Sequence, residues 1–167
     1  MPLEMKVAGL TVDPFTNMPI VILKDFEEKN AIPIWIGILE ASAIATELEK
    51  IRLARPMTHD LVKNLLDSLG VKMVKIVVTD LRDNTFFAAI HLINKDDDVI
   101  LDSRPSDAIA LALRTGSPIF VEERVVEKSR KIDLTGQQKE GVGTAEAEKW
   151  KEILENLSPQ DFGKYKM

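Results

Sequence analysis

The sequence predicts an α+β domain in which helices pack against a single mixed, largely antiparallel sheet. Apolar segments of strand length open the chain, and others recur as a meander over residues 71–102, joined by short polar turns. Between these groups, two helical segments follow one another directly, over 38–54 and 55–70. The regular alternation of strands and helices that builds a doubly wound parallel sheet is missing.

Three strands are expected first. Residues 5–13 alternate apolar and small or polar side chains, and Pro14 ends this strand. Residues 19–25 form a nearly continuous apolar run, which is typical of a buried strand. The third strand covers 32–36, and its Pro33 predicts a sheet edge or a strand start because proline cannot donate to a ladder.

The first helix, 38–54, is rich in helix formers, and Ile44, Leu48 and Ile51 repeat at helical spacing. Glu40 lies near its start, where the helix dipole favours a carboxylate. We therefore interpret Glu40 as a helix-end residue and not as a catalytic one.

The second helix, 55–70, has Thr58 as its expected N-cap and Gly70 at its end. Its apolar stripe consists of Leu61, Leu65, Leu66 and Leu69. Strands are expected over 71–81 and 85–93, because Asp83 and Asn84 between them tolerate the backbone of a tight hairpin turn. A polar turn at 95–98 leads to a last meander strand over 99–102.

The stretch 101–116 predicts a sharp passage from strand to helix. Ser103 or Ser106 is expected to cap the helix, Pro105 suits its first turn, and Gly116 ends it.

This corner is expected to present Asp102, Arg104 and Asp107 close together. Asp107 lies at the positive end of the helix, which favours a carboxylate. Arg104 paired with either aspartate is also interpretable as an ion pair that only holds the corner together.

A short strand over 118–121 and a charged helix over 122–131 complete the predicted domain, 1–131. Residues 132–144 are polar and glycine-containing, as in a linker. Residues 145–167 form an amphipathic helix and a tail, and the apolar side of that helix needs the domain or another subunit.

Composition excludes several classes of protein. The 167 residues include no cysteine, so disulfides, thiolate zinc sites and a cysteine nucleophile are excluded. The net charge of -5 argues against strong non-specific binding to nucleic acid. No apolar run reaches the roughly 18 residues that span a bilayer, and the first residues do not resemble a signal peptide. We therefore expect no membrane association and a cytoplasmic protein.

The sequence has no glycine-rich phosphate loop, no GxSxG and no HExxH. His59 stands at a helix start and alone is typical of a surface or capping histidine, whereas His91 in a strand is typical of a packed one.

The remaining candidates are carboxylates. Asp80 and Asp83 lie at one hairpin end, and Asp102 and Asp107 lie at the corner. Oxygen ligands suit Mg²⁺ or Mn²⁺, and such an ion can activate water beside a phosphate. Arg82 or Arg104 could hold the phosphate oxygens. The alternative interpretation is that these aspartates only cap turns and helices.

Four segments resemble the bacterial bifunctional nuclease domain family, whose members are described as cleaving both DNA and RNA. They are IPIWIGILEASAIA (32–45), RPMTHDLVKNLLDSLG (55–70), VVTDLRDNTFFAAIHL (77–92) and LDSRPSDAIALALRTGSPIFV (101–121). The resemblance implies a compact α+β domain, self-association into a homo-oligomer, and phosphodiester hydrolysis with a divalent ion.

The resemblance brings no set of catalytic residues with it, so we assign roles from polarity within the matching segments. The predicted catalytic residues are Asp102, Asp107, Arg104 and His59. The predicted substrate-binding residues are Arg82 and Arg55, and the predicted metal ligands are Asp80, Asp83, Asp102 and Asp107. The expected function is a nuclease acting on DNA or RNA. The alternative is a non-catalytic, oligomeric interaction or regulatory module with the same fold.

Overall fold

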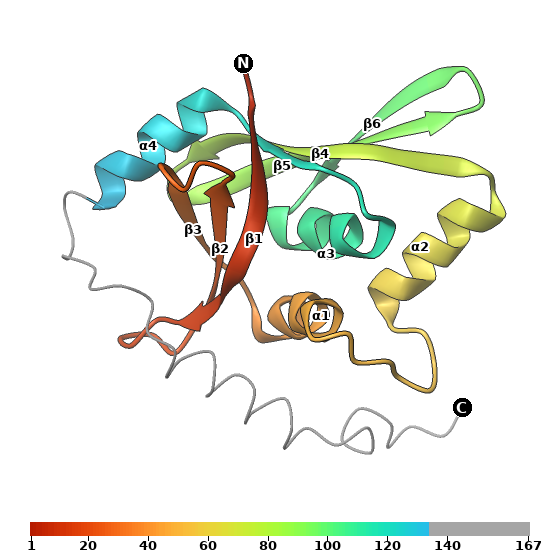
Figure 1. The fold of residues 1–167 in the computed structure, drawn as a ribbon, viewed down its shortest axis with the longest axis horizontal. Helices are drawn as coiled ribbons and strands as arrows, with labels where there is room; N and C mark the ends of the chain where they lie inside the picture. Colours follow the sequence, from red (N-terminus) through yellow and green to blue (C-terminus); the bar gives the residue numbers. More distant parts are fainter. Residues whose placement is uncertain (134–167) are drawn as a thin grey trace.

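The computed structural model describes residues 1–133, which form a seven-stranded sheet and four helices (Figure 1). The elements in chain order are β1 (Leu3–Val12), β2 (Pro19–Asp25), β3 (Ala31–Trp35), α1 (Ile38–Leu48), α2 (Thr58–Ser68), β4 (Val71–Arg82), β5 (Thr85–Asn94), β6 (Asp97–Ser103), α3 (Pro105–Thr115), β7 (Ile119–Val121) and α4 (Glu123–Asp133). The last helix enters the predicted linker, 132–144. The rest of that linker and the helix predicted over 145–167 lie outside the described residues.

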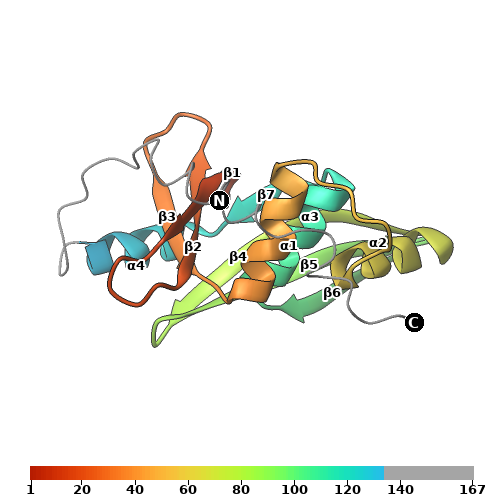
Figure 2. The same ribbon diagram turned by 90° about the horizontal axis from the view of Figure 1, so that it is seen from below.

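The strands are ordered β3-β2-β1-β7-β4-β5-β6. Every neighbouring pair is antiparallel except β4 and β7, which run parallel. The predicted α+β class and the single mixed, largely antiparallel sheet are therefore confirmed. On one face of the sheet, α3 packs on β4 and β5, and α1 lies beneath α3 on the side away from these strands (Figure 1). The helix α2 contacts α3 and β4, whereas α4 contacts β4 and β3 and lies beside β3 in the view from below (Figure 2).

The core lies between α3 and the sheet. Apart from Asp107, every residue of α3 from Pro105 to Ala112 is buried. Ile109 of α3, Ile76 of β4 and Ile44 of α1 are fully buried. Each such side chain contributes about 1.5–3 kcal/mol to stability, and together they fix the position of α3 against α1 and β4.

The corner before α3 differs from the prediction in its cap. Arg104 is the N-cap residue, with extended backbone, and Pro105 begins the helix. Neither predicted serine caps it: Ser103 Oγ donates a 2.9 Å hydrogen bond to the Arg104 carbonyl, and Ser106 is buried. Gly116 ends the helix at φ 68°, the left-handed conformation expected of it.

The two preceding helices are shorter than predicted. The first ends at Leu48 and not at residue 54, because Lys50 adopts a left-handed backbone with φ 54°. The second begins at Thr58, whose predicted capping role falls to Met57. Residues 49–57 between them form a loop that runs below α3 from α1 to α2 (Figure 1).

The second helix is packed on one side only. None of its residues is buried, although Val62 and Leu66 pack against the core. Of the predicted apolar stripe, Leu61, Leu65 and Leu69 instead point to solvent, at 61%, 55% and 65% exposed. Across residues 1–133, the helices are too short or too polar to span a membrane.

Candidate functional site

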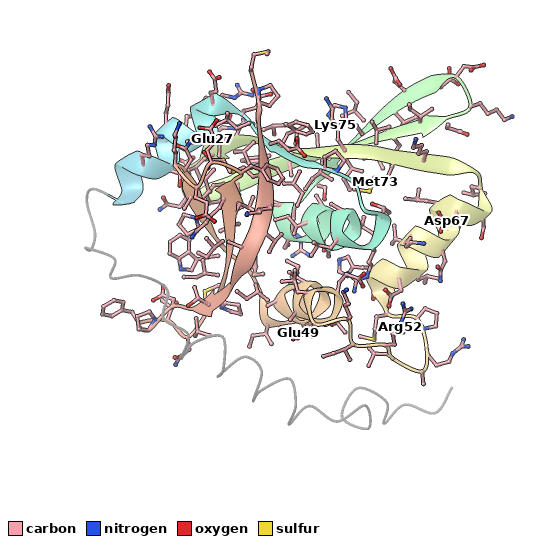
Figure 3. All side chains as sticks on the ribbon, in the orientation of Figure 1. Glu27, Glu49, Arg52, Asp67, Met73 and Lys75 are labelled. Atoms are coloured by element: carbon pink, nitrogen blue, oxygen red, sulfur yellow. The ribbon has the colours of Figure 1, made fainter. Side chains whose placement is uncertain are left out.

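A pocket of about 830 Å³ opens between α1, the first turn of α2, and α3. The loop 49–57 forms one wall, and Figure 3 labels Arg52 on it. Both polar and apolar side chains line the pocket. The titratable side chains in the lining include Glu40, His59, Asp60, Arg104, Asp107 and Arg114, with Arg52 and Arg55 from the loop. The volume falls within the range of small-molecule sites.

Arg104 stands at the start of α3 with its guanidinium held between two carboxylates. Its Nε and Nη2 lie 3.0 Å and 2.9 Å from Asp107 Oδ2, and its Nη1 lies 2.9 Å from Glu40 Oε1. The hydrogen bond with Asp107, followed by the contact with Glu40, raises the pKa of Arg104 above its usual value. The side chain is still 65% exposed, and two of its five N–H donors have no partner in these contacts. Two donors of Arg104 are therefore available to a ligand in the pocket.

Glu40 reaches Arg104 because the chain before α1 leaves room for it. Gly37 is the N-cap of α1, and a Cβ atom placed there would collide with the Glu40 carboxylate. The glycine thus lets the glutamate fold back over the helix start. Glu40 was interpreted from the sequence as a helix-end carboxylate, and the structure adds that it pairs with Arg104.

His59 and Asp107 form a second contact in the pocket. Nε2 of the imidazole lies 2.9 Å from Asp107 Oδ1, and both side chains are partly buried. A carboxylate in this position fixes the ring, and when Nε2–H donates to it, Nδ1 keeps the lone pair. An imidazole held in this way can accept a proton from a neighbouring group.

A further ion pair ties α2 to α3. Arg114 Nε donates a 2.7 Å hydrogen bond to Asp60 Oδ1, and Arg114 Nη1 donates to the Ala110 carbonyl at 2.9 Å. The Arg114 side chain is only 4% exposed. Burial acts to raise the pKa of Asp60, but the Met57 N–H and the Arg114 guanidinium outweigh it and lower that pKa.

The loop wall contributes free positive charge. Arg52 and Arg55 are exposed and line the pocket, and no carboxylate within residues 1–133 pairs with either of them. Arg55 was predicted to bind substrate, and its position in the pocket wall suits that role. Arg52 was not singled out, because an isolated arginine in a segment of helical pattern gives no such signal.

The structure brings His59, Arg104, Asp107 and Arg55 together in one pocket, but Asp102 does not join them. In the β4–β5–β6 ladder, Asp102 is paired with Ala89, and Ala89 with Val77. Paired residues share a face of the sheet, and neighbouring residues along a strand face opposite sides. Since Ala88 is in the core under α3, Asp102 faces the other side.

Asp80, Arg82 and Asp83 lie at the β4–β5 turn and do not line the pocket either. Asp80 is paired with Lys128 Nζ at 2.7 Å and with Arg82 Nε at 3.0 Å. The Arg82 guanidinium is 4.5 Å from the centre of the Phe87 ring. Asp83 occupies the turn itself, with φ 49°.

A divalent ion was expected on Asp80, Asp83, Asp102 and Asp107. Asp80 is paired with Lys128 of α4, and Asp107 is paired with Arg104 in the pocket. Over residues 1–133, no group of three or more histidine, aspartate or glutamate side chains is placed to hold a metal ion. The four aspartates therefore do not fit a shared metal centre in this arrangement, and the need for Mg²⁺ or Mn²⁺ stays a prediction.

Two residues of the pocket escaped the sequence analysis in different ways. Arg114 carried no signal, since an arginine near a helix end is typical of any exposed helix. Asp60 was not among the predicted site residues. A repeated pattern could have pointed to it, because Arg-Pro precedes an acidic residue at the start of both α2 and α3.

The comparisons with known proteins bear on the same residues. The model of the bifunctional nuclease domain matches residues 21–133, which include the whole pocket. An uncharacterised protein of Mycobacterium tuberculosis is 37% identical over 163 residues, which is 95% of this chain and 97% of that protein.

Plant proteins match over part of their length. Bifunctional nuclease 1 of Oryza sativa subsp. indica is 27% identical over 110 residues, covering 63% of this chain and 33% of its own. Bifunctional nuclease 1 of Arabidopsis thaliana is 29% identical over 137 residues, covering 74% of this chain and 42% of its own. The shared part is thus less than half of each plant protein.

Proposed function

This chain belongs to the bifunctional nuclease domain family, and from that premise we propose that it hydrolyses phosphodiester bonds of DNA and RNA in the pocket between α1, α2 and α3. The observation that carries the proposal is the His59–Asp107 contact of 2.9 Å beside the exposed guanidinium of Arg104. A proton acceptor and an anion binder therefore stand side by side, as attack on a phosphate requires.

In this proposal His59 takes a proton from the attacking water, and Asp107 holds the ring and stabilises the imidazolium that forms. The water oxygen bonds to phosphorus, the bond from phosphorus to the leaving oxygen breaks, and that oxygen is protonated from the imidazolium or from solvent. Arg104 holds a non-bridging oxygen with its remaining donors, and Arg55 approaches the phosphate from the loop. No step is assigned to a metal ion.

The test is digestion of single-stranded DNA and of RNA by the purified full chain, with and without a chelator. We expect cleavage by the wild-type protein and a fall of about 10²- to 10⁴-fold in kcat for His59→Ala, the range of acid–base catalysis. Loss of cleavage in the presence of the chelator would mean that the reaction also needs a divalent ion. Absence of cleavage by the wild type, or equal rates for His59→Ala, would contradict the proposal.

A second candidate function, the oligomeric interaction module, is supported by the outward face of α2. Leu61, Leu65 and Leu69 recur every fourth residue and so form one stripe on the helix. Ser68, which lies beside them on this face, is also uncharged. A stripe of this kind is typical of a surface that another protein covers.

We propose a second copy of the chain as that partner. The chains carry a net charge of -5 each, and the α2 face is uncharged, so two copies that meet through it bring no like charges together. The edge strand β6 is less suited to self-pairing. An antiparallel pair centred on Ile100 would set Asp98 opposite Asp102 of the other copy, which is unfavourable. Self-association is compatible with either function.

A further inference from the structure

A second pocket of about 300 Å³ also has Arg104 in its lining. Its walls come from four separate parts of the chain, one of which is Met18 just before β2. Trp35 and Gly37 belong to the end of β3 and the start of α1, and Asn84 and Phe86 belong to the β4–β5 turn and β5. The start of α3 closes it with Arg104 and Pro105.

Arg104 is the single residue shared by the linings of the two pockets over residues 1–133. A phosphate bound by Arg104 would therefore lie next to both pockets. A nucleic acid strand offers a nucleoside on each side of every phosphate, so the two pockets correspond to two neighbouring nucleosides.

The two pockets differ in the chemistry of their walls. The large pocket is lined by arginines, carboxylates, aliphatic side chains and the imidazole of His59, with no Phe, Tyr or Trp among the described residues. The small pocket contains Trp35 and Phe86. Aromatic side chains bind nucleobases by stacking, whatever the base.

The indole of Trp35 is held in place. Its Nε1 donates a 2.9 Å hydrogen bond to Asp13 Oδ2, and Trp35 is 41% exposed and lines the pocket. Asp13 is in turn fixed by the Phe15 N–H at 2.9 Å. A ring that is oriented before a ligand arrives loses little freedom on binding, which favours stacking. Asn84 adds an amide that can donate to and accept from a base edge.

We infer that the small pocket is a nucleobase subsite, which holds the base next to the phosphate bound by Arg104; this rests on the proposed nuclease function. A base can enter such a pocket only when it is unstacked and unpaired. The site therefore selects single-stranded DNA or RNA over a duplex. The subsite takes purines and pyrimidines alike, because stacking does not depend on the identity of the base.

Binding is tested first, without reference to cleavage. The chain has two tryptophans, so the full-length variant Trp150→Phe reports on Trp35 alone. We expect adenosine 5′-monophosphate to quench its fluorescence saturably and inorganic phosphate at equal concentration to leave it unchanged. Equal quenching by both, or by neither, would overturn the subsite.

Cleavage is tested second. Trp35→Ala is expected to raise KM for a single-stranded oligonucleotide by about 5- to 150-fold, and Trp35→Phe to restore most of the loss because a ring is kept. Asn84→Gly, which preserves the left-handed turn at φ 58°, is expected to raise KM less. Phe26→Ala is the matched control, since this exposed aromatic lies outside both pockets.

The two proposals fail separately. Wild-type cleavage with unchanged KM in Trp35→Ala, or equal cleavage of duplex and single strand, would overturn the subsite and leave the nuclease function. Quenching of Trp35 by the nucleotide without any cleavage would overturn the nuclease function and leave the subsite.

Discussion

His59 and Asp107 are 48 residues apart in the chain, and the imidazole Nε2 of one lies 2.9 Å from the carboxylate Oδ1 of the other. The contact joins the first turn of α2 to the first turn of α3. Since Asp107 also binds Arg104, one carboxylate orients both the proposed proton acceptor and the proposed phosphate binder. Asp107 is thus the residue at the start of α3 that positions both His59 and Arg104.

Asp107→Asn is expected to lower kcat for cleavage by at least about 100-fold, because an amide neither stabilises the imidazolium nor holds Arg104 in the same way. Asp102→Asn is the matched control. Its side chain faces the other side of the sheet, so we expect wild-type rates. Steady-state kinetics with a single-stranded oligonucleotide checks both, and a comparable loss in Asp102→Asn would contradict the assignment.

Asp60→Asn is expected to destabilise the fold, because it leaves the buried Arg114 guanidinium without its counter-charge. Removing a hydrogen-bonded partner of a charged group costs about 1.5–3 kcal/mol. The midpoint of urea unfolding measures the change.

The exposed Lys63–Asp67 pair of α2 provides the control, at 2.7 Å. Asp67→Asn is expected to cost no more than about 0.5 kcal/mol, since exposed helix pairs contribute little. Similar losses of stability in Asp60→Asn and Asp67→Asn would show that burial of Arg114 does not make its ion pair with Asp60 more stabilising than an exposed pair.

The stability of the protein is expected to fall in acid through Asp80. The hydrogen bond from Lys128, followed by that from the Leu81 N–H, lowers the pKa of Asp80 below its ordinary value of 3.8. A carboxyl group with a lowered pKa in the folded state stabilises the fold above its unfolded pKa. This contribution is lost as the pH falls through the folded value.

Thermal unfolding between about pH 6 and pH 2 tests this. In Lys128→Met the pKa of Asp80 should return toward its ordinary value, so the difference in Tm between wild type and variant should shrink as the pH falls. A difference in Tm that is constant over this range would show that the pair contributes nothing that depends on the charge of Asp80.

Gly37→Ala is expected to displace the Glu40 carboxylate from Arg104 and to lower cleavage while the fold is kept. The backbone of Gly37, at φ -75°, is accessible to alanine, so the added methyl acts on the glutamate and not on the chain. Gly9→Ala is the control, because a Cβ there meets nothing within 4 Å. Unchanged KM and kcat in Gly37→Ala would mean that Glu40 does not position Arg104.

Leu65→Lys is expected to abolish self-association by placing a charge at the centre of the α2 face in both copies. Each buried leucine contributes about 1.5–3 kcal/mol, so we expect the dimer to weaken by more than about 100-fold. Sedimentation equilibrium measures this. Ile100→Lys on β6 is the control, since Ile100 is also exposed but lies outside the proposed face. A monomeric wild type, or dissociation only in Ile100→Lys, would contradict the α2 interface.

The sequence allowed the class of fold and the start of α3 to be predicted because local chemistry decides them. The signals for these elements each determine the backbone over a few residues. They are the apolar runs of strand length, the turn at Asp83 and Asn84, Pro105 and Gly116. The end of α1 could not be predicted in this way. No glycine or proline marks Leu48, and the chain turns where Lys50 adopts a backbone that its own preference does not favour.

The site was predicted in part for the same reason. Arg104 and Asp107 are three residues apart on one helix turn, so their contact follows from helical spacing. Whether Asp102 joins them depends on the strand register, because its pairing with Ala89 decides which face of the sheet Asp102 lies on. Spacing along the chain does not reveal that register. The contacts with Glu40 and His59 depend on how α1 and α2 pack against α3.

The position of β7 determines when the domain can fold during synthesis. β7 separates β1 from β4, and Met5 pairs with Ile119 near the other end of the domain. The first three strands can pair with one another early, but they can join the meander only after the chain has been translated past Val121. A ribosome stalled before that codon would expose two unpaired strand edges, where nascent chains aggregate and chaperones bind.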